Sequence, residues 1–185
     1  MLSQTRMLPI LLTATVILAG DAMAQDPDRP PIPLSQLGTV TQRVGYTDIN
    51  VRYRRPGARG RALFGNVVEW GRIWTPGADS VTTIAFSRDV LVENQPIAAG
   101  RYSLWVVPKT DTPWTVILSR VVDAFHVPYP GPEHDVIRFE ISPQRGEHME
   151  TLAFYFPEVT RSTAVLRLHW GETIIPIGVR TVDQG

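Results

Sequence analysis

The sequence predicts an all-β protein: a single antiparallel β-sandwich, jelly-roll-like or barrel-like, that follows a signal peptide. Short segments with alternating apolar and polar residues recur from Thr39 onward, as expected of strands that bury one face. The 16 prolines and 14 glycines of the chain supply the turn signals between such strands. After the N-terminal region, no segment keeps apolar residues at helical spacing over about eleven positions.

The N-terminal residues 1–24 have the order of a secretory signal peptide. Arg6 supplies a positive charge, Met7–Ala19 is mostly apolar, and Ala22-Met23-Ala24 offers small residues at the cleavage positions. We expect cleavage after Ala24 and a periplasmic or extracellular location. An uncleaved N-terminal anchor is the alternative, although the apolar run is shorter than the roughly 20 residues of a comfortable span. No cysteine follows the run, which excludes a lipoprotein anchor.

The composition excludes several classes of function. The 18 basic and 18 acidic side chains give a net charge of zero, which argues against general attraction to nucleic acid or to anionic membranes. The chain has no cysteine, so it can form neither disulfides nor thiolate-held zinc or iron–sulfur sites. We expect no cofactor and no stable membrane span after cleavage, and the sequence leaves the oligomeric state open.

The organisation predicted after the signal peptide is an extended proline-rich leader at residues 25–38 and one β-sandwich domain at residues 39–181. Within the domain, the segments with strand-like patterns are, in chain order, Thr47–Arg54, Thr82–Val92, Tyr102–Val107, Trp114–Ser119, Val136–Ser142, Thr151–Phe156, Val165–Trp170 and Thr173–Val179. The last two are joined by Gly171-Glu172, which predicts a tight hairpin. The alternation in Val165–Trp170 places His169 on the outward, solvated face.

The alternation also predicts the core of the sandwich. Strict alternation in Thr47–Arg54, for example, puts Ile49 and Val51 on one face and polar residues on the other. The residues expected to be buried in this way are Ile49, Val51, Leu104, Val116, Phe139, Phe154 and Leu168.

One long segment, Arg55–Ser80, breaks the strand pattern. Long ordered connections in compact domains are usually functional, and a disordered segment would rarely keep Trp70 and Trp74. We therefore expect an ordered loop packed over one end of the sandwich.

This loop concentrates positive charge. Between Arg52 and Arg72 the only acid is Glu69. The arginines of this stretch are Arg52, Arg54, Arg55, Arg59, Arg61 and Arg72. Their rigid forks of donors suit carboxylate or phosphate oxygens, so the segment predicts a site for a small anionic molecule or a glycan. The residues of this hypothetical ligand site are Arg54, Arg55, Arg61, Arg72, Trp74 and Asp79.

The alternative for the same charges is structural. The arginines would then pair with carboxylates such as Asp48, Asp79, Glu69 and Asp89, and would only hold the loop in place.

The chain resembles a bacterial family called domain of unknown function 2911. The resemblance covers roughly Val40 to Val179 and rests on several motifs in the expected order. These are Tyr53-Arg54-Arg55-Pro56, Gly60-Arg61, Leu63-Phe64-Gly65, Trp74, Gly77-Ala78-Asp79, Thr82-Thr83, Ala99-Gly100, Tyr102–Pro108 and Trp114–Leu118. It implies a secreted protein of β-sandwich fold, and the family has no established activity to transfer. The chain departs from the family's pattern at Thr75 and Ser80, where an arginine and an acid are common, and at Asp79, where an asparagine is. The joint loss of an arginine and an acid is what an ion pair with a structural role would give.

Other groups that could carry chemistry are sparse. His126, Glu133, His134 and Asp135 lie in one proline-rich segment, but their spacing fits no helix-borne or hairpin-borne metal motif, so no metal site is predicted. His148 is expected in a turn. The chain has neither a cysteine nor a G-x-S-x-G elbow for nucleophilic catalysis.

Two functions remain. The favoured one is a non-catalytic secreted module that binds a small anionic or glycan ligand, or a protein partner, through the Arg-rich loop. The alternative is a cell-envelope hydrolase that uses Asp79 with Glu69 or His126. An enzyme should bring at least two titratable groups together in one concave pocket, whereas a scaffold without a ligand should leave Arg54, Arg55 and Arg61 fully bonded.

Overall fold

The computed structural model describes residues 31–182, so the predicted signal peptide and residues 25–30 of the predicted leader lie outside the described residues. Residues 33–182 form one compact unit of antiparallel strands. The strands are β1 (Gln36–Val44), β2 (Thr47–Arg55), β3 (Thr83–Phe86), β4 (Val90–Val92), β5 (Gln95–Ile97), β6 (Gly100–Val107), β7 (Trp114–Ser119), β8 (Asp135–Ile141), β9 (Gln144–Val159) and β10 (Thr163–Thr181). The 3-10 helix η1 (Pro132–His134) precedes β8. Within this part of the chain, no helix is long and apolar enough to cross a membrane.

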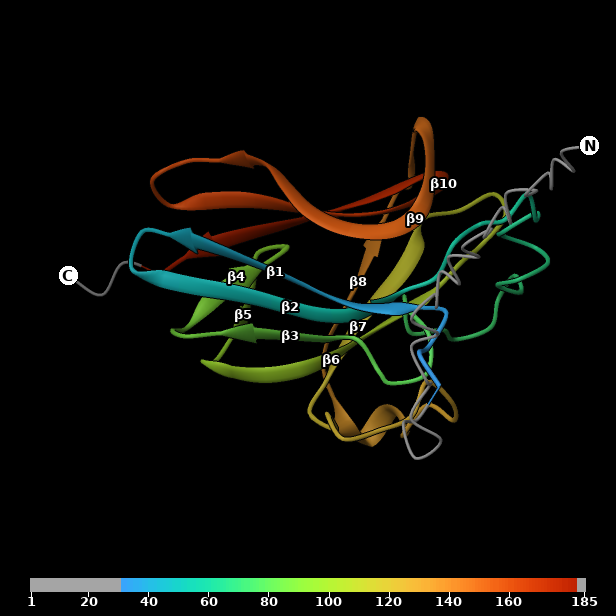
Figure 1. Ribbon diagram of the computed structural model, residues 1–185. Coiled ribbons are helices and arrows are strands. Elements are labelled where there is room, and N and C mark those ends of the chain that lie inside the picture. The colour runs from blue at the N-terminus through green and yellow to red at the C-terminus, as the bar shows by residue number, and fades with distance from the viewer. Residues whose placement is uncertain (1–30, 183–185) are drawn as a thin grey trace, which may run out of the picture. The chain divides into compact units, whose positions relative to one another are not determined.

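Two sheets build the sandwich (Figure 1). The six-stranded sheet has the order β1-β2-β3-β6-β7-β8, and the four-stranded sheet has the order β5-β4-β10-β9. Both are antiparallel throughout, and each keeps edge strands, so the fold is a sandwich and not a closed barrel. The predicted fold class is therefore confirmed. β1 begins at Gln36, inside the segment predicted to be a leader.

The core lies between the two sheets and matches the predicted alternation. In β2 the burial alternates strictly from Thr47 to Tyr53, so every second side chain points inward. All the residues predicted for the core are buried: Ile49, Val51, Leu104, Val116, Phe139, Phe154 and Leu168. Burying these side chains is the main favourable contribution to the stability of a fold without disulfides.

The β-branched segment Thr82–Val92 contributes to both sheets. Its first part, β3, pairs with β2 and β6. Its second part, β4, pairs with β10 in the other sheet. The crossing between them, Ser87–Asp89, is fixed because the N–H of Ser87 donates to Asp48 O at 3.0 Å and Asp89 accepts from the N–H of Ala99 at 2.8 Å.

The last element, β10, reverses direction at Gly171-Glu172. A straight strand of this length would separate its ends by about 60 Å. Instead the N–H of Thr181 donates to Ser162 O at 2.8 Å, so the two ends lie side by side, as Figure 1 also shows. Gly171 has φ +58, which matches the first central position of a tight hairpin turn. The hairpin predicted at Gly171-Glu172 is present.

Two predictions about histidines in this region are wrong. His148 lies within β9, not in a turn. His169 is 5 % exposed, and both of its ring nitrogens have partners: Nε2 donates to Glu147 O at 2.9 Å, and Nδ1 accepts from the hydroxyl of Tyr155 at 3.1 Å. β9 takes the outer path around the β10 turn with several register shifts, and this detour brings its main chain over the face that the sequence pattern marked as solvated.

Candidate functional site

The loop between β2 and β3 is anchored to several elements. Isolated bridges join Gly57 to Thr151 of β9 and Trp74 to Val106 of β6. The apolar side chains of Ala58, Leu63 and Val68 are buried. The loop therefore packs against the sandwich, in agreement with the expectation for Arg55–Ser80.

Five aromatic side chains, which we call the aromatic cluster, gather where this loop meets the sheets. Phe64 is at its centre: its ring centroid lies 4.8 Å from Trp114, 6.0 Å from Trp74, 6.3 Å from Trp70 and 6.4 Å from Trp170. Trp74 and Trp170 stack at 6.1 Å with 20° between their planes. Such aromatic pairs add to the stabilisation that burial alone gives.

Trp70 is the member of the cluster that faces solvent. It is 42 % exposed, whereas its neighbour Trp114 is 4 % exposed. The indole of Trp70 lies over Gly65, since a Cβ at Gly65 would come within 2.4 Å of Trp70 Nε1. The adjacent N–H of Gly71 donates to Pro108 O at 2.7 Å. The contact with Gly65 thus limits movement of the exposed ring, and the bond of Gly71 fixes the main chain next to it.

Trp70 forms part of the lining of an open groove of about 560 Å³, which we call the Trp70 groove. The other walls come from the β6–β7 connection, the β8–β9 corner and the β10 turn. Its charged residues are Lys109, Asp111, Arg145 and Glu172. Its uncharged polar residues are Thr110, Thr112, Ser142, Gln144 and Thr173.

The charges of the Trp70 groove balance. Lys109 and Arg145 are matched by Asp111 and Glu172, and Arg145 Nη2 lies 2.8 Å from Glu172 Oε2. The groove therefore has no net attraction for an anion, although it offers many hydroxyl, amide and charged groups as hydrogen-bond partners. An exposed aromatic side chain amid such groups suits a sugar, whose C–H face can pack on an aromatic ring while its hydroxyls bond to the walls.

The arginines predicted for the ligand site donate chiefly to main-chain carbonyls. Arg61 donates from Nε to Ala58 O at 3.0 Å and from Nη2 to Gly57 O at 2.8 Å. Arg55 Nε donates to Leu152 O at 3.2 Å.

Arg54 Nη1 donates to Ser35 O at 3.3 Å, while its buried Nε has no partner among the described residues. Among the contacts that residues 31–182 make with one another, carboxylate pairing, the structural alternative, occurs in this set only for Arg72, which bonds to Glu69 at 2.8 Å.

The remaining predicted site residues lie elsewhere. Trp74 belongs to the aromatic cluster, while Asp79 is exposed, with φ +60, and its main-chain oxygen accepts from the N–H of His126 at 2.9 Å. Asp48, one of the carboxylates considered as a partner, pairs with Arg43 instead. Arg54 and Arg55 end β2, whereas the other four predicted residues lie in the loop. No hydrogen bond or ion pair within residues 31–182 joins any two of the six, so the hypothesis that they form one site stays a prediction.

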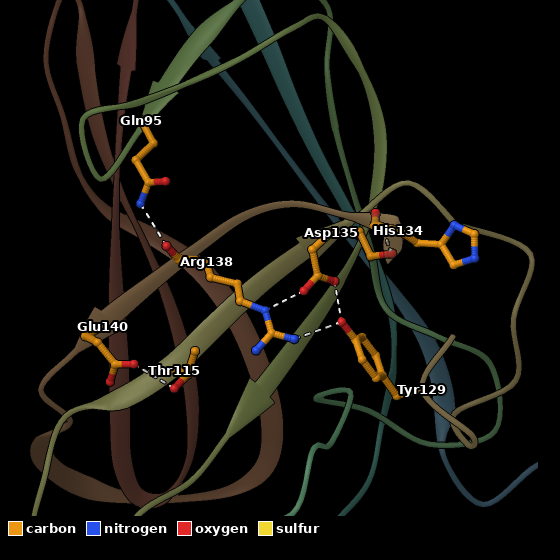
Figure 2. A network of polar contacts seen from close by, with 8 residues as sticks. Gln95, Thr115, Tyr129, His134, Asp135, Arg138 and Glu140 are labelled. Carbon is orange, nitrogen blue, oxygen red and sulfur yellow. Dashed lines mark hydrogen bonds and ion pairs between the residues drawn. The ribbon is translucent and has the colours of Figure 1, made fainter. Parts of the chain in front are cut away.

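The proline-rich segment with His134 and Asp135 is held by a polar network (Figure 2). The carboxylate of Asp135 accepts from both the hydroxyl of Tyr129 and Nε of Arg138, and Arg138 Nη2 donates to the Tyr129 hydroxyl at 3.1 Å. Burial, together with the bond to Asp135, raises the pKa of Tyr129 to about 12. Figure 2 shows the His134 ring pointing away from this network. The residues 31–182 contain no cluster of His, Asp and Glu suited to a metal ion.

Sequence reasoning singled out Trp70 as an aromatic of the loop but missed the groove around it. Lys109, Asp111, Arg145 and Glu172 come from three connections far apart in the chain. The available signals were the proline-bounded connection Pro108–Pro113 and the turn at Gly171-Glu172, which mark loops but not which loops meet.

Comparison with known protein families gives a match over most of the chain. The family model "Protein of unknown function (DUF2911)" matches residues 35–179. The chain belongs to this family. No curated protein and no solved structure matches the chain. Thr75, one of the positions expected to depart from the family's pattern, is fully buried; its hydroxyl donates to Leu104 O at 2.9 Å and accepts from the N–H of Thr82 at 3.1 Å.

Proposed function

We propose that this member of the DUF2911 family is an exported, non-catalytic module that binds a glycan in the Trp70 groove. The observation that supports it is the Trp70 indole, which is exposed in an open polar groove and packs against the other members of the aromatic cluster. Fixing the ring before binding removes part of the entropic cost of ordering it on the ligand. Of the residues that line the groove, only Trp70 belongs to the Arg-rich loop favoured by the sequence, so the proposed site uses this tryptophan, and not the arginines, as its anchor.

The balance of charge favours an uncharged glycan over an acidic one. Two basic and two acidic side chains line the groove, so a polyanion would gain no net Coulomb attraction there. The polar lining also favours sugar hydroxyls over the apolar anchor that a protein partner usually inserts.

The hydrolase alternative gains no support from the contacts of its proposed residues. Glu69 pairs with Arg72 on the surface. The His126 ring lies 3.0 Å from the main-chain oxygen of Asp79 and makes no bond to its carboxylate. A general acid and a general base that share one substrate would need to face a common pocket.

Export is part of the proposal and rests on the order of charged, apolar and small residues before Gln25. Mass spectrometry of the protein from its native host should find an N-terminus at or near Gln25. A product that begins at Met1 in the cytoplasm would contradict export.

The binding proposal is tested with a panel of neutral hexasaccharides of glucose, xylose and N-acetylglucosamine, together with polygalacturonate as an acidic member. We expect a neutral member to bind and Trp70→Ala to weaken its binding by about tenfold or more, as for a central aromatic anchor. Isothermal titration calorimetry measures both affinities.

Phe125→Ala is the matched control, since Phe125 is 59 % exposed and does not line the groove. It should bind like the unmodified chain. Equal binding by Trp70→Ala and the unmodified chain, or no binding of any member, would refute the glycan site.

A further inference from the structure

A second concave site lies at the other part of the loop, next to β9. It is a pocket of about 370 Å³ whose lining includes Arg55, Gly57, Arg59, Glu150 and Thr151. We call it the Arg55–Arg59 pocket. It shares no lining residue with the Trp70 groove.

Arg55 is held so that part of its guanidinium stays free. Its Nε donates to Leu152 O, and its stem packs against Gly38, where an added Cβ would come within 2.7 Å of Arg55 Cδ. Neither Nη group of Arg55 has a partner among the described residues. A stem fixed in this way presents two N–H-bearing nitrogens at low entropic cost.

Arg59 is held by its main chain, and its guanidinium has no hydrogen-bond or ion-pair partner within residues 31–182. Its N–H donates to Glu150 Oε1 at 2.8 Å, and its backbone has the unusual φ of +53. The side chain lies over Gly57, whose added Cβ would be 3.6 Å from Arg59 Cγ and 3.7 Å from Nε. Left-handed backbone at a residue other than glycine carries strain, and such strain is concentrated at binding and active sites.

Glu150, the one carboxylate of the pocket, bonds to groups other than the two guanidinium groups. Glu150 Oε1 accepts from the N–H of Arg59, and Oε2 lies 3.2 Å from His148 Nε2. No ion pair joins Glu150 to the guanidinium of Arg55 or Arg59 within residues 31–182. The main-chain N–H of Arg59 is the first cause of a lowered pKa at Glu150, so this acid is ionised at neutral pH and offsets one of the two positive charges.

We infer that the Arg55–Arg59 pocket binds a single small oxyanion, the carboxylate or phosphate group of a ligand. Two guanidinium forks around one pocket match the paired oxygens of such a group. The excess of one positive charge suits a single small anionic group better than a polyanion. This inference is independent of the glycan proposal, because the two sites share no residue.

The inference is tested by NMR titration of the main-chain amides of Arg59 and Glu150 at low ionic strength, where surface charges are least screened. The probes are inorganic phosphate and galacturonate, with galactose as the uncharged counterpart of the second. Saturable shifts with either anion and none with galactose support the site. The tighter of the two anions identifies the source of the group as phosphate ester or sugar acid.

Three variants make the test specific. Arg59→Gln should weaken anion binding by about ten- to a hundredfold, the effect of losing a charged hydrogen bond. Glu150→Gln should tighten it, because the amide oxygen still accepts from Arg59 N–H while the opposing charge is gone. Arg52→Gln removes an exposed arginine outside the pocket and should change the affinity less than twofold.

Two results would overturn the inference: no saturable shift with either anion up to tens of millimolar, or equal weakening by Arg59→Gln and Arg52→Gln, which would indicate diffuse attraction only. Arg59 is exposed, so its variant should stay folded. Trp70→Ala should leave anion binding unchanged, and this separates a failure here from a failure of the glycan site.

Discussion

At the residue scale, the position of Trp70 depends on a glycine. Gly65 has φ +92, and an added Cβ would come within 2.4 Å of Trp70 Nε1. We expect Gly65→Ala to displace the indole, to destabilise the fold by about 1–2 kcal/mol and to weaken glycan binding. Gly60→Ala is the control, since Gly60 also has a positive φ but open space around it. Urea unfolding measures the loss of stability, and tryptophan fluorescence reports the displacement of the indole. Unchanged fluorescence in Gly65→Ala would contradict the close contact between Gly65 and the Trp70 ring.

The hydroxyl of Tyr129 should make the stability of the fold depend on pH at alkaline values. The pKa of its hydroxyl is raised to about 12 in the folded chain and is about 10 in an unfolded one. The folded state therefore keeps a proton that the unfolded state has lost, so stability falls as pH rises from about 10 to about 12. Tyr129→Phe should remove this part of the decline. Denaturant unfolding of both proteins from pH 8 to 12 measures it, and parallel stability curves would contradict the shift.

At the element scale, the β10 hairpin is fixed by its turn and by a contact with the loop. Gly171 has φ +58, and an added Cβ would come within 2.8 Å of Leu63 Cδ1. We expect Gly171→Ala to cost about 1–2 kcal/mol from turn strain and more from the clash. Adding Leu63→Ala removes the clash, so the double-mutant cycle should show a coupling of at least about 0.5 kcal/mol. Additive effects would indicate that Leu63 does not pack on the turn.

The strands also show which features of the fold the alternation of the sequence could predict. Alternation located the strands and their inward faces, since Leu168 and Phe154 are buried as predicted. It failed at His169, because alternation tells which face a residue is on but not whether another strand covers that face. The bonds of Arg61 to main-chain carbonyls could not be predicted from the sequence either, because they depend on how the loop turns back on itself.

At the scale of the whole molecule, topology creates the candidate sites. The Trp70 groove forms where the β6–β7 connection, the β8–β9 corner and the β10 turn meet around one exposed ring. The proximity of Lys109, Arg145 and Glu172 follows from the order of strands in two sheets and is encoded in no local motif. β9 serves both sites, with Arg145 at the groove and Glu150 at the Arg55–Arg59 pocket.

The most direct test of glycan binding in the Trp70 groove uses the indole N–H signals of the five tryptophans in a ¹⁵N–¹H NMR titration. The probe is the neutral hexasaccharide that binds best in calorimetry. We expect the Trp70 signal, assigned by its loss in Trp70→Phe, to shift saturably. The Trp105 signal should stay in place, because its indole is fully buried and donates to Ser103 Oγ at 2.9 Å. A saturable shift elsewhere with an unmoved Trp70 signal, or no shift at all, would contradict the account.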